Sequence, residues 1–117
     1  MALSTNLLDP VEVTTGAATA TLAVQPADNC HTIIVYNQDT NNSALFGFVT
    51  TGTALSSANA VLVPAASGIT LRIGTAKYRP CGGFADVSGI VVRVKNNGVG
   101  TPILSFQFLN STGDTPP

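Results

Sequence analysis

The stretch Gly68-Ile69-Thr70-Leu71-Arg72-Ile73-Gly74 decides the fold class, because apolar and polar residues alternate along it between two glycines. In an extended chain its three aliphatic residues would point to one side, and Thr70 and Arg72 to the other. This is the pattern of a strand with one buried and one solvated face. No segment of the chain shows the 3.6-residue period of an amphipathic helix. The stretch therefore predicts an all-β protein.

Strand-like runs recur on both sides of this stretch, separated by residues that favour turns. The runs are Val11–Thr14, Ala18–Gln25, His31–Asn37, Ala44–Thr50, Ala60–Val63, Ile90–Lys95 and Pro102–Asn110. A lone sheet of such strands would leave one apolar face in water. We therefore predict an antiparallel β-sandwich or jelly roll of about seven to eight short strands, forming a single domain over residues 1–117.

Several local patterns make sharper predictions. Apolar residues occupy both faces of His31–Asn37, so both faces should be covered, and this strand should form a hairpin with Ala44–Thr50. Asn96-Asn97-Gly98 should form a hairpin turn before the last strand, because Asn-Gly supplies positive φ. Gly47, between two phenylalanines, indicates a bulge or a close approach by another backbone. Thr51–Asn59 should be a long surface loop or one turn of helix.

Two regions outside the regular strands supply the candidate interface. Residues 1–9 form a leucine-bearing arm that should be ordered only when something covers it, and residues 111–117 form a C-terminal tail. The segment Lys77–Gly89 is irregular, and such a long loop is usually functional or packed over the core. Its tyrosine could belong to an aromatic and cationic contact surface, or could simply anchor the loop. The candidate interface residues are Leu3, Leu7, Leu8, Lys77, Tyr78, Arg79 and Phe84.

Charged residues make up only 9% of the chain, and the formal net charge is −1. An average soluble domain has about 25% charged residues. Either Thr, Ser, Asn and Gly make a polar surface, or other copies or a partner cover much of it. Nucleic acid is not expected as a partner, because the basic residues are scattered. No stretch reaches the ~20 apolar residues of a membrane helix, and Met1–Asn6 lacks the features of a signal peptide.

No catalytic or metal-binding pattern emerges from the residues. A zinc site needs about four converging ligands, whereas the chain has one histidine and two cysteines. The six acidic residues lie mostly in predicted turns or near the termini, where turn bonding explains them. Gly82-Gly83 lacks the residues of a phosphate loop. We expect neither enzyme activity nor a cofactor. Cys30 and Cys81 are expected to be free buried thiols, or a bridge if two strand ends meet.

A series of segments between Thr32 and Ile73 carries a family resemblance. The segments are the strand Ile33–Asn37, the aromatic–glycine run Leu45–Phe48, the polar loop Leu55–Asn59, the turn Val61–Ala65 and the strand Gly68–Leu71. Their order resembles that of small β-sandwich virion proteins of tailed bacteriophages. The resemblance covers about 40 residues, in a chain taken as one domain of ordinary size.

The resemblance implies a capsid decoration, or cement, protein. Such a protein would bind the lattice of the major capsid protein as a homo-oligomer, with a trimer suited to quasi-threefold positions, and would stabilise the head. It would be assembled in the host cytoplasm and end in the virion, and it carries no catalytic residues. The alternative is a receptor- or carbohydrate-binding module of a tail or head fibre, for which the candidate rings are Tyr36, Tyr78 and Phe84.

Overall fold

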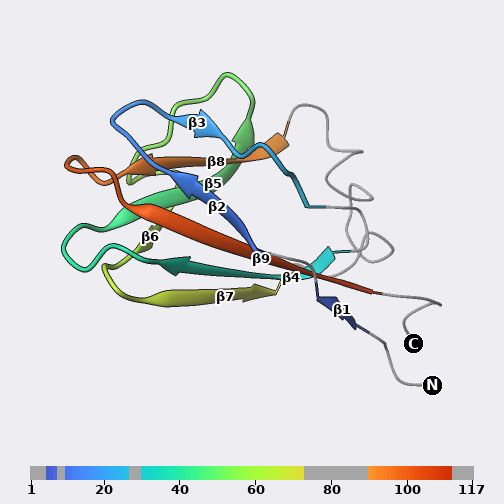
Figure 1. Ribbon diagram of the computed structural model, residues 1–117. Helices are drawn as coiled ribbons and strands as arrows, with labels where there is room; N and C mark the ends of the chain where they lie inside the picture. The colour runs from blue at the N-terminus through green and yellow to red at the C-terminus, as the bar shows by residue number, and fades with distance from the viewer. Residues whose placement is uncertain (1–4, 8–9, 27–29, 73–89, 112–117) are drawn as a thin grey trace.

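A computed structural model of the chain shows two layers of β-strands and describes residues 5–7, 10–26, 30–72 and 90–111 (Figure 1). The strands in these ranges are β1 (Thr5–Leu7), β2 (Val11–Thr14), β3 (Ala20–Thr21), β4 (Cys30–Asn37), β5 (Ala44–Thr50), β6 (Val61–Val63), β7 (Gly68–Arg72), β8 (Ile90–Asn96) and β9 (Ile103–Ser111). Within the same ranges, no helix is long and apolar enough to cross a membrane.

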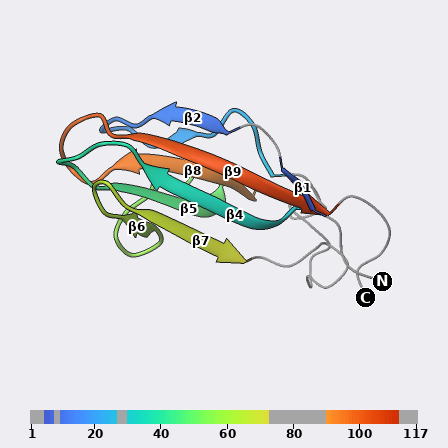
Figure 2. The same ribbon diagram turned by 60° about the horizontal axis from the view of Figure 1, so that its bottom comes forward.

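The strands form two antiparallel sheets that face each other (Figure 2). In the five-stranded sheet, β9 lies between β4 and the successive short strands β2 and β1, and β7 pairs with the other side of β4. The four-stranded sheet has the order β3-β8-β5-β6. The pairs β2·β9, β3·β8, β4·β7 and β5·β6 are nested, as in a long hairpin rolled across two layers. This order is that of a jelly roll and confirms the predicted fold class.

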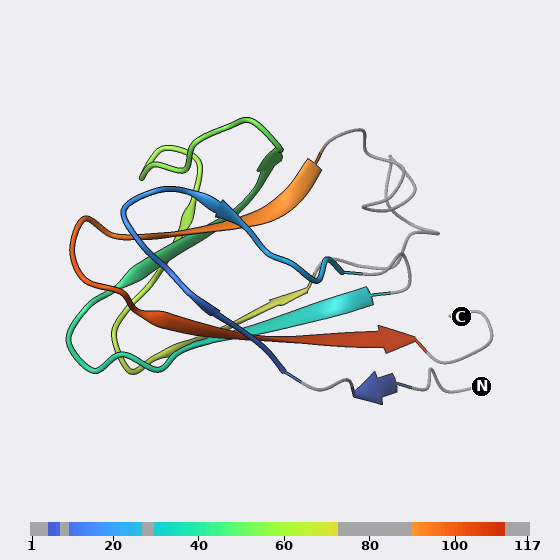
Figure 3. The same ribbon diagram turned by 45° about the horizontal axis from the view of Figure 1, so that its top comes forward.

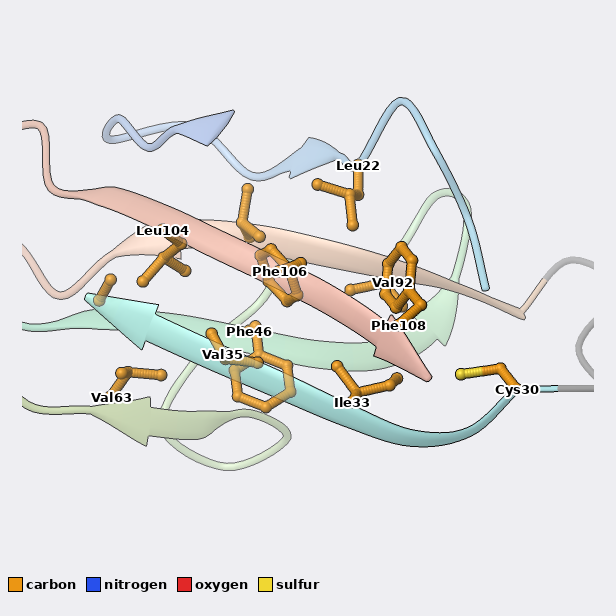
Figure 4. Packing of buried hydrophobic residues seen from close by; sticks show 12 residues of the cluster. Leu22, Cys30, Ile33, Val35, Phe46, Val63, Val92, Leu104, Phe106 and Phe108 are labelled. Atoms are coloured by element: carbon orange, nitrogen blue, oxygen red, sulfur yellow. The ribbon is translucent and has the colours of Figure 1, made fainter. Parts of the chain in front are cut away.

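The core lies between the two sheets and is built from the alternating inward residues of their central strands. In β9, Leu104, Phe106 and Phe108 are buried, as their alternation with polar residues predicted (Figure 4). The ring of Phe106 meets that of Phe46 on the opposite sheet edge to face, with centroids 5.7 Å apart. Such aromatic pairs contribute about 0.5–1.5 kcal/mol beyond the burial of their area. Ile33 from β4 completes the centre of this cluster.

Both predicted hairpins are wrong, because each connection crosses from one sheet to the other. β4 belongs to the five-stranded sheet and β5 to the four-stranded one, and β8 and β9 are likewise divided. Alternation of apolar residues does not tell whether two consecutive strands share a sheet, because strands of both sheets point apolar residues into the same core. Gly98 does have positive φ, 99°, as the Asn-Gly signal required. The turn chemistry was therefore predicted correctly, but its partner strands were not.

Two further strand predictions need correction. The run Ala18–Gln25 pairs only over β3, because the side-chain amide of Gln25 then takes over pairing with the backbone of Val92, donating to its carbonyl and accepting from its N–H. The outer face of β4 is only partly covered by the described residues, since Tyr36 is 46% exposed whereas Thr32 is 7% exposed. The stretch that begins at Gly68 forms β7, which lies at an edge of its sheet. The segment Thr51–Asn59 is a loop with turns.

Candidate functional site

The outer face of the four-stranded sheet, which we call the covered face, is closed by a loop of the same chain. Leu45 and Val49 of β5 point away from the main core, yet they are buried. Leu55, from the loop between β5 and β6, packs on them and is only 3% exposed. Ala60 completes this second cluster. The face therefore has its own small apolar core, and Leu62, which pairs with Leu45 on edge strand β6, stays 46% exposed beside it.

Two residues of the sheet hold this loop against the covered face. At Gly47, an added Cβ would lie 2.9 Å from the backbone oxygen of Asn59. The glycine thus allows the close backbone approach that the sequence suggested. Arg93 of β8 donates hydrogen bonds to the carbonyl oxygen of Thr53, the carbonyl oxygen of Thr19 and the hydroxyl of Thr21. One guanidinium therefore joins two loops to the sheet, using the fork of donors that arginine provides.

The outer face of the five-stranded sheet, which we call the open face, has no such cover from the described residues. Since the core residues of β4 and β9 alternate inward, the residues between them point outward. Tyr36 and Ile103 are exposed by 46% and 37%, and Ile34 and Leu109 are half-buried. Apolar side chains therefore lie on the two central strands of this face.

The ring of Tyr36 lies beside a glycine on the neighbouring strand. Tyr36 pairs with Gly68 across β4 and β7, and a Cβ added at Gly68 would lie 3.3 Å from Cδ1 of the tyrosine ring. The ring therefore lies over the space that the glycine leaves on the edge strand. With two χ angles, a tyrosine loses little conformational freedom when a partner covers it, which favours tyrosine as an interface anchor.

The open face is nearly uncharged and its two charges lie far apart. Among the described residues on the strands of this face, the charged side chains are Glu12 on β2 and Arg72 on β7, and Asp39 lies in the loop beside Ile103. Gln38 donates a 2.6 Å hydrogen bond to the carboxylate of Glu12. Depletion of charge at the centre with charge at the rim is the composition typical of a protein interface. The open face therefore has the chemistry to bind protein.

The connections from β4 to β5 and from β8 to β9 lie at the same end of the sandwich (Figure 3), and buried asparagines there have structural partners. The amide of Asn37 donates to the carbonyl oxygens of Asn42 and Val63. Asn96 donates to the carbonyl oxygen of Gly100 and accepts from the N–H of Gly98. The two side chains therefore hold the connections that cross between the sheets.

Asp39 shapes the neighbouring loop. Its carboxylate accepts backbone hydrogen bonds from Asn41 and then Asn42, and these lower its pKa below the ordinary value of an aspartate. A shallow depression of about 160 Å³ lies beside it, lined by Gln38, Asp39, Thr101 and Ile103. This volume is below the ~300 Å³ of a small-molecule site. In the described part of the chain, no three His, Cys, Asp or Glu residues are close enough to hold a metal.

The residues predicted for the interface are not brought together by the described structure. Leu7 lies in β1 by its backbone pairing with Leu109. The others, Leu3, Leu8, Lys77, Tyr78, Arg79 and Phe84, lie outside the described residues. Cys30 is buried and contacts the carbonyl oxygen of Thr32, whereas Cys81 lies outside the described residues.

The sequence analysis missed most of the open face. In the sequence analysis, Tyr36 was named only as one of three candidate rings for a receptor- or carbohydrate-binding module. Ile34 was placed on the same face as Tyr36, but Ile103 and Leu109 were overlooked, although the outward positions of a strand with inward phenylalanines could have indicated them.

Comparisons with known proteins bear on the fold. No family model matches the chain, and no curated protein matches it. A solved chain described as "Bacillus endospore appendages form a novel family of disulfide-linked pili" is similar, with a TM-score of 0.52 and 10% identity. The match covers 95% of this chain and 89% of that chain. At this identity the similarity shows a shared fold, and it agrees with the two-layer sandwich.

Proposed function

We propose that the protein is a structural subunit of a larger assembly, and specifically a decoration protein on the capsid of a tailed bacteriophage. The observation that carries the proposal is the difference between the two outer faces. One is closed by its own loop, whereas the other leaves Tyr36 and Ile103 in solvent with hardly any charge around them. A face of that composition is suited to burial against protein.

The protein would act by binding to the capsid lattice and stabilising it, without chemistry. A subunit whose core and covered face are complete folds before it binds, so binding energy is not spent on ordering the sandwich. Burying the open face and the edges beside it would contribute about 25 cal/mol per Å² of apolar area before association costs. A subunit that binds only the assembled lattice of the major capsid protein stabilises that lattice by mass action. The homo-oligomer, the trimer and the virion location expected from the sequence remain part of this proposal.

The experiment starts from virus particles prepared from the source of this chain. An antibody against the protein should label the particle surface, and quantitative mass spectrometry should find the protein in a fixed ratio to the major capsid protein. Particles stripped of it should lose heat resistance and regain it when the purified protein is added back. Stripped particles that resist heat as well as intact ones would contradict the proposal.

A second candidate function is a subunit of a fibre, and the structural similarity to a chain described as forming pili favours it. Among the described strands, β6 and β7 also lie at the edges of their sheets, and such edges can pair with another chain. Electron microscopy of the concentrated purified protein separates the two functions. Filaments formed without capsids support the fibre, whereas single subunits or small closed oligomers support decoration.

A further inference from the structure

The open face is matched in charge to a second copy of itself. We propose that two copies of this chain pack through their open faces, related by a two-fold axis that runs parallel to the sheets. The inference rests on the proposed assembly function and names one contact within it. It follows from three observations: where the two charges lie, where the apolar residues lie, and how large the face is.

The two charges lie at opposite corners of the face. Glu12 is beside Ser105 and Tyr36 in one row across the sheet, and Arg72 is beside Thr32 in a row four residues further along β4. They are three strand spacings apart across the sheet. With strands about 4.8 Å apart and about 3.3 Å of rise per residue, the two Cα atoms are about 19 Å apart.

The two-fold axis lies between the two sheets, passes over the midpoint of this diagonal and runs perpendicular to it. Rotation about this axis exchanges the two corners. It places Glu12 of each copy opposite Arg72 of the other, so that one acid and one base make two identical ion pairs. Because the diagonal runs at about 45° to the strands in this geometry, the strands of the two copies cross at about 90°. Near-perpendicular crossing is one of the two packing classes of stacked sheets.

The apolar residues of β4 lie where this axis passes. The midpoint of the diagonal falls between Ile34 and Gln107, which pair across β4 and β9. Tyr36 lies one row away, so its ring approaches the ring of the second copy and the surface around Gly68 there. The tyrosine is thus the anchor of the contact and the ion pairs set its register.

The size of the contact predicts a reversible pair. Two four-strand faces crossing at a right angle overlap over a square of about 19 Å a side. This is smaller than the ~800 Å² per partner of a standard stable interface. The pair should therefore form in concentrated solution, or between subunits already held on a lattice, and should dissociate on dilution. A two-fold dimer is also a different oligomer from the trimer expected from the sequence, so the molecular mass in solution distinguishes the two.

Sedimentation velocity over a concentration series tests the contact. The wild-type chain should shift from monomer to dimer as concentration rises, and Tyr36→Asp should remain monomeric throughout. Glu12→Arg and Arg72→Glu each place like charges opposite one another, and each should raise the dissociation constant about tenfold or more. The double variant Glu12→Arg/Arg72→Glu restores opposite charges and should recover dimerisation. Lys95→Glu, outside the open face, is the matched charge-reversal control and should dimerise like the wild type.

Failure of the inference is distinguishable from failure of the proposed function. A wild-type chain that stays monomeric at all concentrations overturns the pairing. A double variant that dimerises no better than either single variant also overturns it, because the charges then do not face each other. In both cases binding of the wild-type chain to stripped particles, measured by co-sedimentation, still decides the decoration function by itself.

Discussion

Both outer faces of the sandwich carry apolar side chains, but only one of the two faces has them covered by the chain's own loop. The covered face turns Leu45 and Val49 outward and closes them with Leu55 from the loop between β5 and β6. The open face turns Tyr36 and Ile103 outward and leaves them exposed. Covering a sheet with a loop requires a residue that lets the backbones approach and a group that holds the loop. The four-stranded sheet has both, and the described part of the five-stranded sheet has neither.

This difference shows which apolar residues serve the fold and which are left for a partner. Removing a residue from the covered face should cost stability. Removing one from the open face should cost association and leave the fold almost unchanged. The predictions below test the two halves of this statement, beginning with the largest expected change.

Leu55→Ala should lower the free energy of unfolding by about 2–3 kcal/mol. The substitution leaves a cavity beside the second cluster and exposes its remaining members, and Leu→Ala at buried sites costs about 2–5 kcal/mol. Urea denaturation followed by circular dichroism measures the change. Leu62→Ala is the matched control, because Leu62 is 46% exposed on edge strand β6, and it should cost less than about 1 kcal/mol. Equal costs would mean that the loop does not close the face.

Gly47→Ala should destabilise the protein by about 2 kcal/mol. The new methyl group would lie 2.9 Å from the backbone oxygen of Asn59 and 3.0 Å from Cδ2 of Leu55, so the loop must move away. Gly52→Ala makes the same substitution in the loop after β5, where nothing lies within 4 Å of the added Cβ. We expect it to be neutral or slightly stabilising. Thermal unfolding of both variants measures the difference, and a Gly52 variant as unstable as the Gly47 variant would argue against close packing.

Arg93→Lys should destabilise the protein by about 1 kcal/mol although it keeps the charge. The lysine ammonium cannot reproduce the fork that reaches Thr53, Thr19 and Thr21 together. Hydrogen exchange should also become faster in the loop between β5 and β6. If the charge alone held the loop, the lysine variant would match the wild type in both measurements.

Asp39→Asn should lower stability at neutral pH and flatten the decline of stability in acid. Hydrogen bonds from the backbone of Asn41 and then Asn42 lower the pKa of Asp39 in the folded state. The stability that the carboxylate contributes is therefore fully present above the ordinary aspartate pKa of about 3.9, and is lost as pH falls through the lower folded pKa. The variant should show a flatter decline in acid when urea unfolding is measured from neutral to acidic pH. Parallel curves for the two proteins would contradict the prediction.

Local patterns in the sequence were sufficient for the strands and the core, but not for the pairing between strands. Alternation around Phe106 correctly placed the inward residues of β9, and the glycine at position 47 correctly indicated a close approach. The hairpins failed because an Asn-Gly turn looks the same whether it joins neighbouring strands or crosses between sheets. The covered face depends on contacts such as that of Leu55 with Leu45, which no local period encodes. The exposure of an outward tyrosine becomes known only when the structure shows that no described strand or loop packs over it.

The most direct test of the central claim is hydroxyl-radical footprinting of the wild-type protein, read at Tyr36 and Leu55 at low and high concentration. Our account predicts that Leu55 is protected at both concentrations, because the covered face belongs to the fold. Tyr36 should be modified in dilute solution and protected when the protein is concentrated, because the open face is then occupied by a second copy. Tyr36 protected at every concentration, or Leu55 modified as readily as Tyr36, would contradict the division into a covered and an open face.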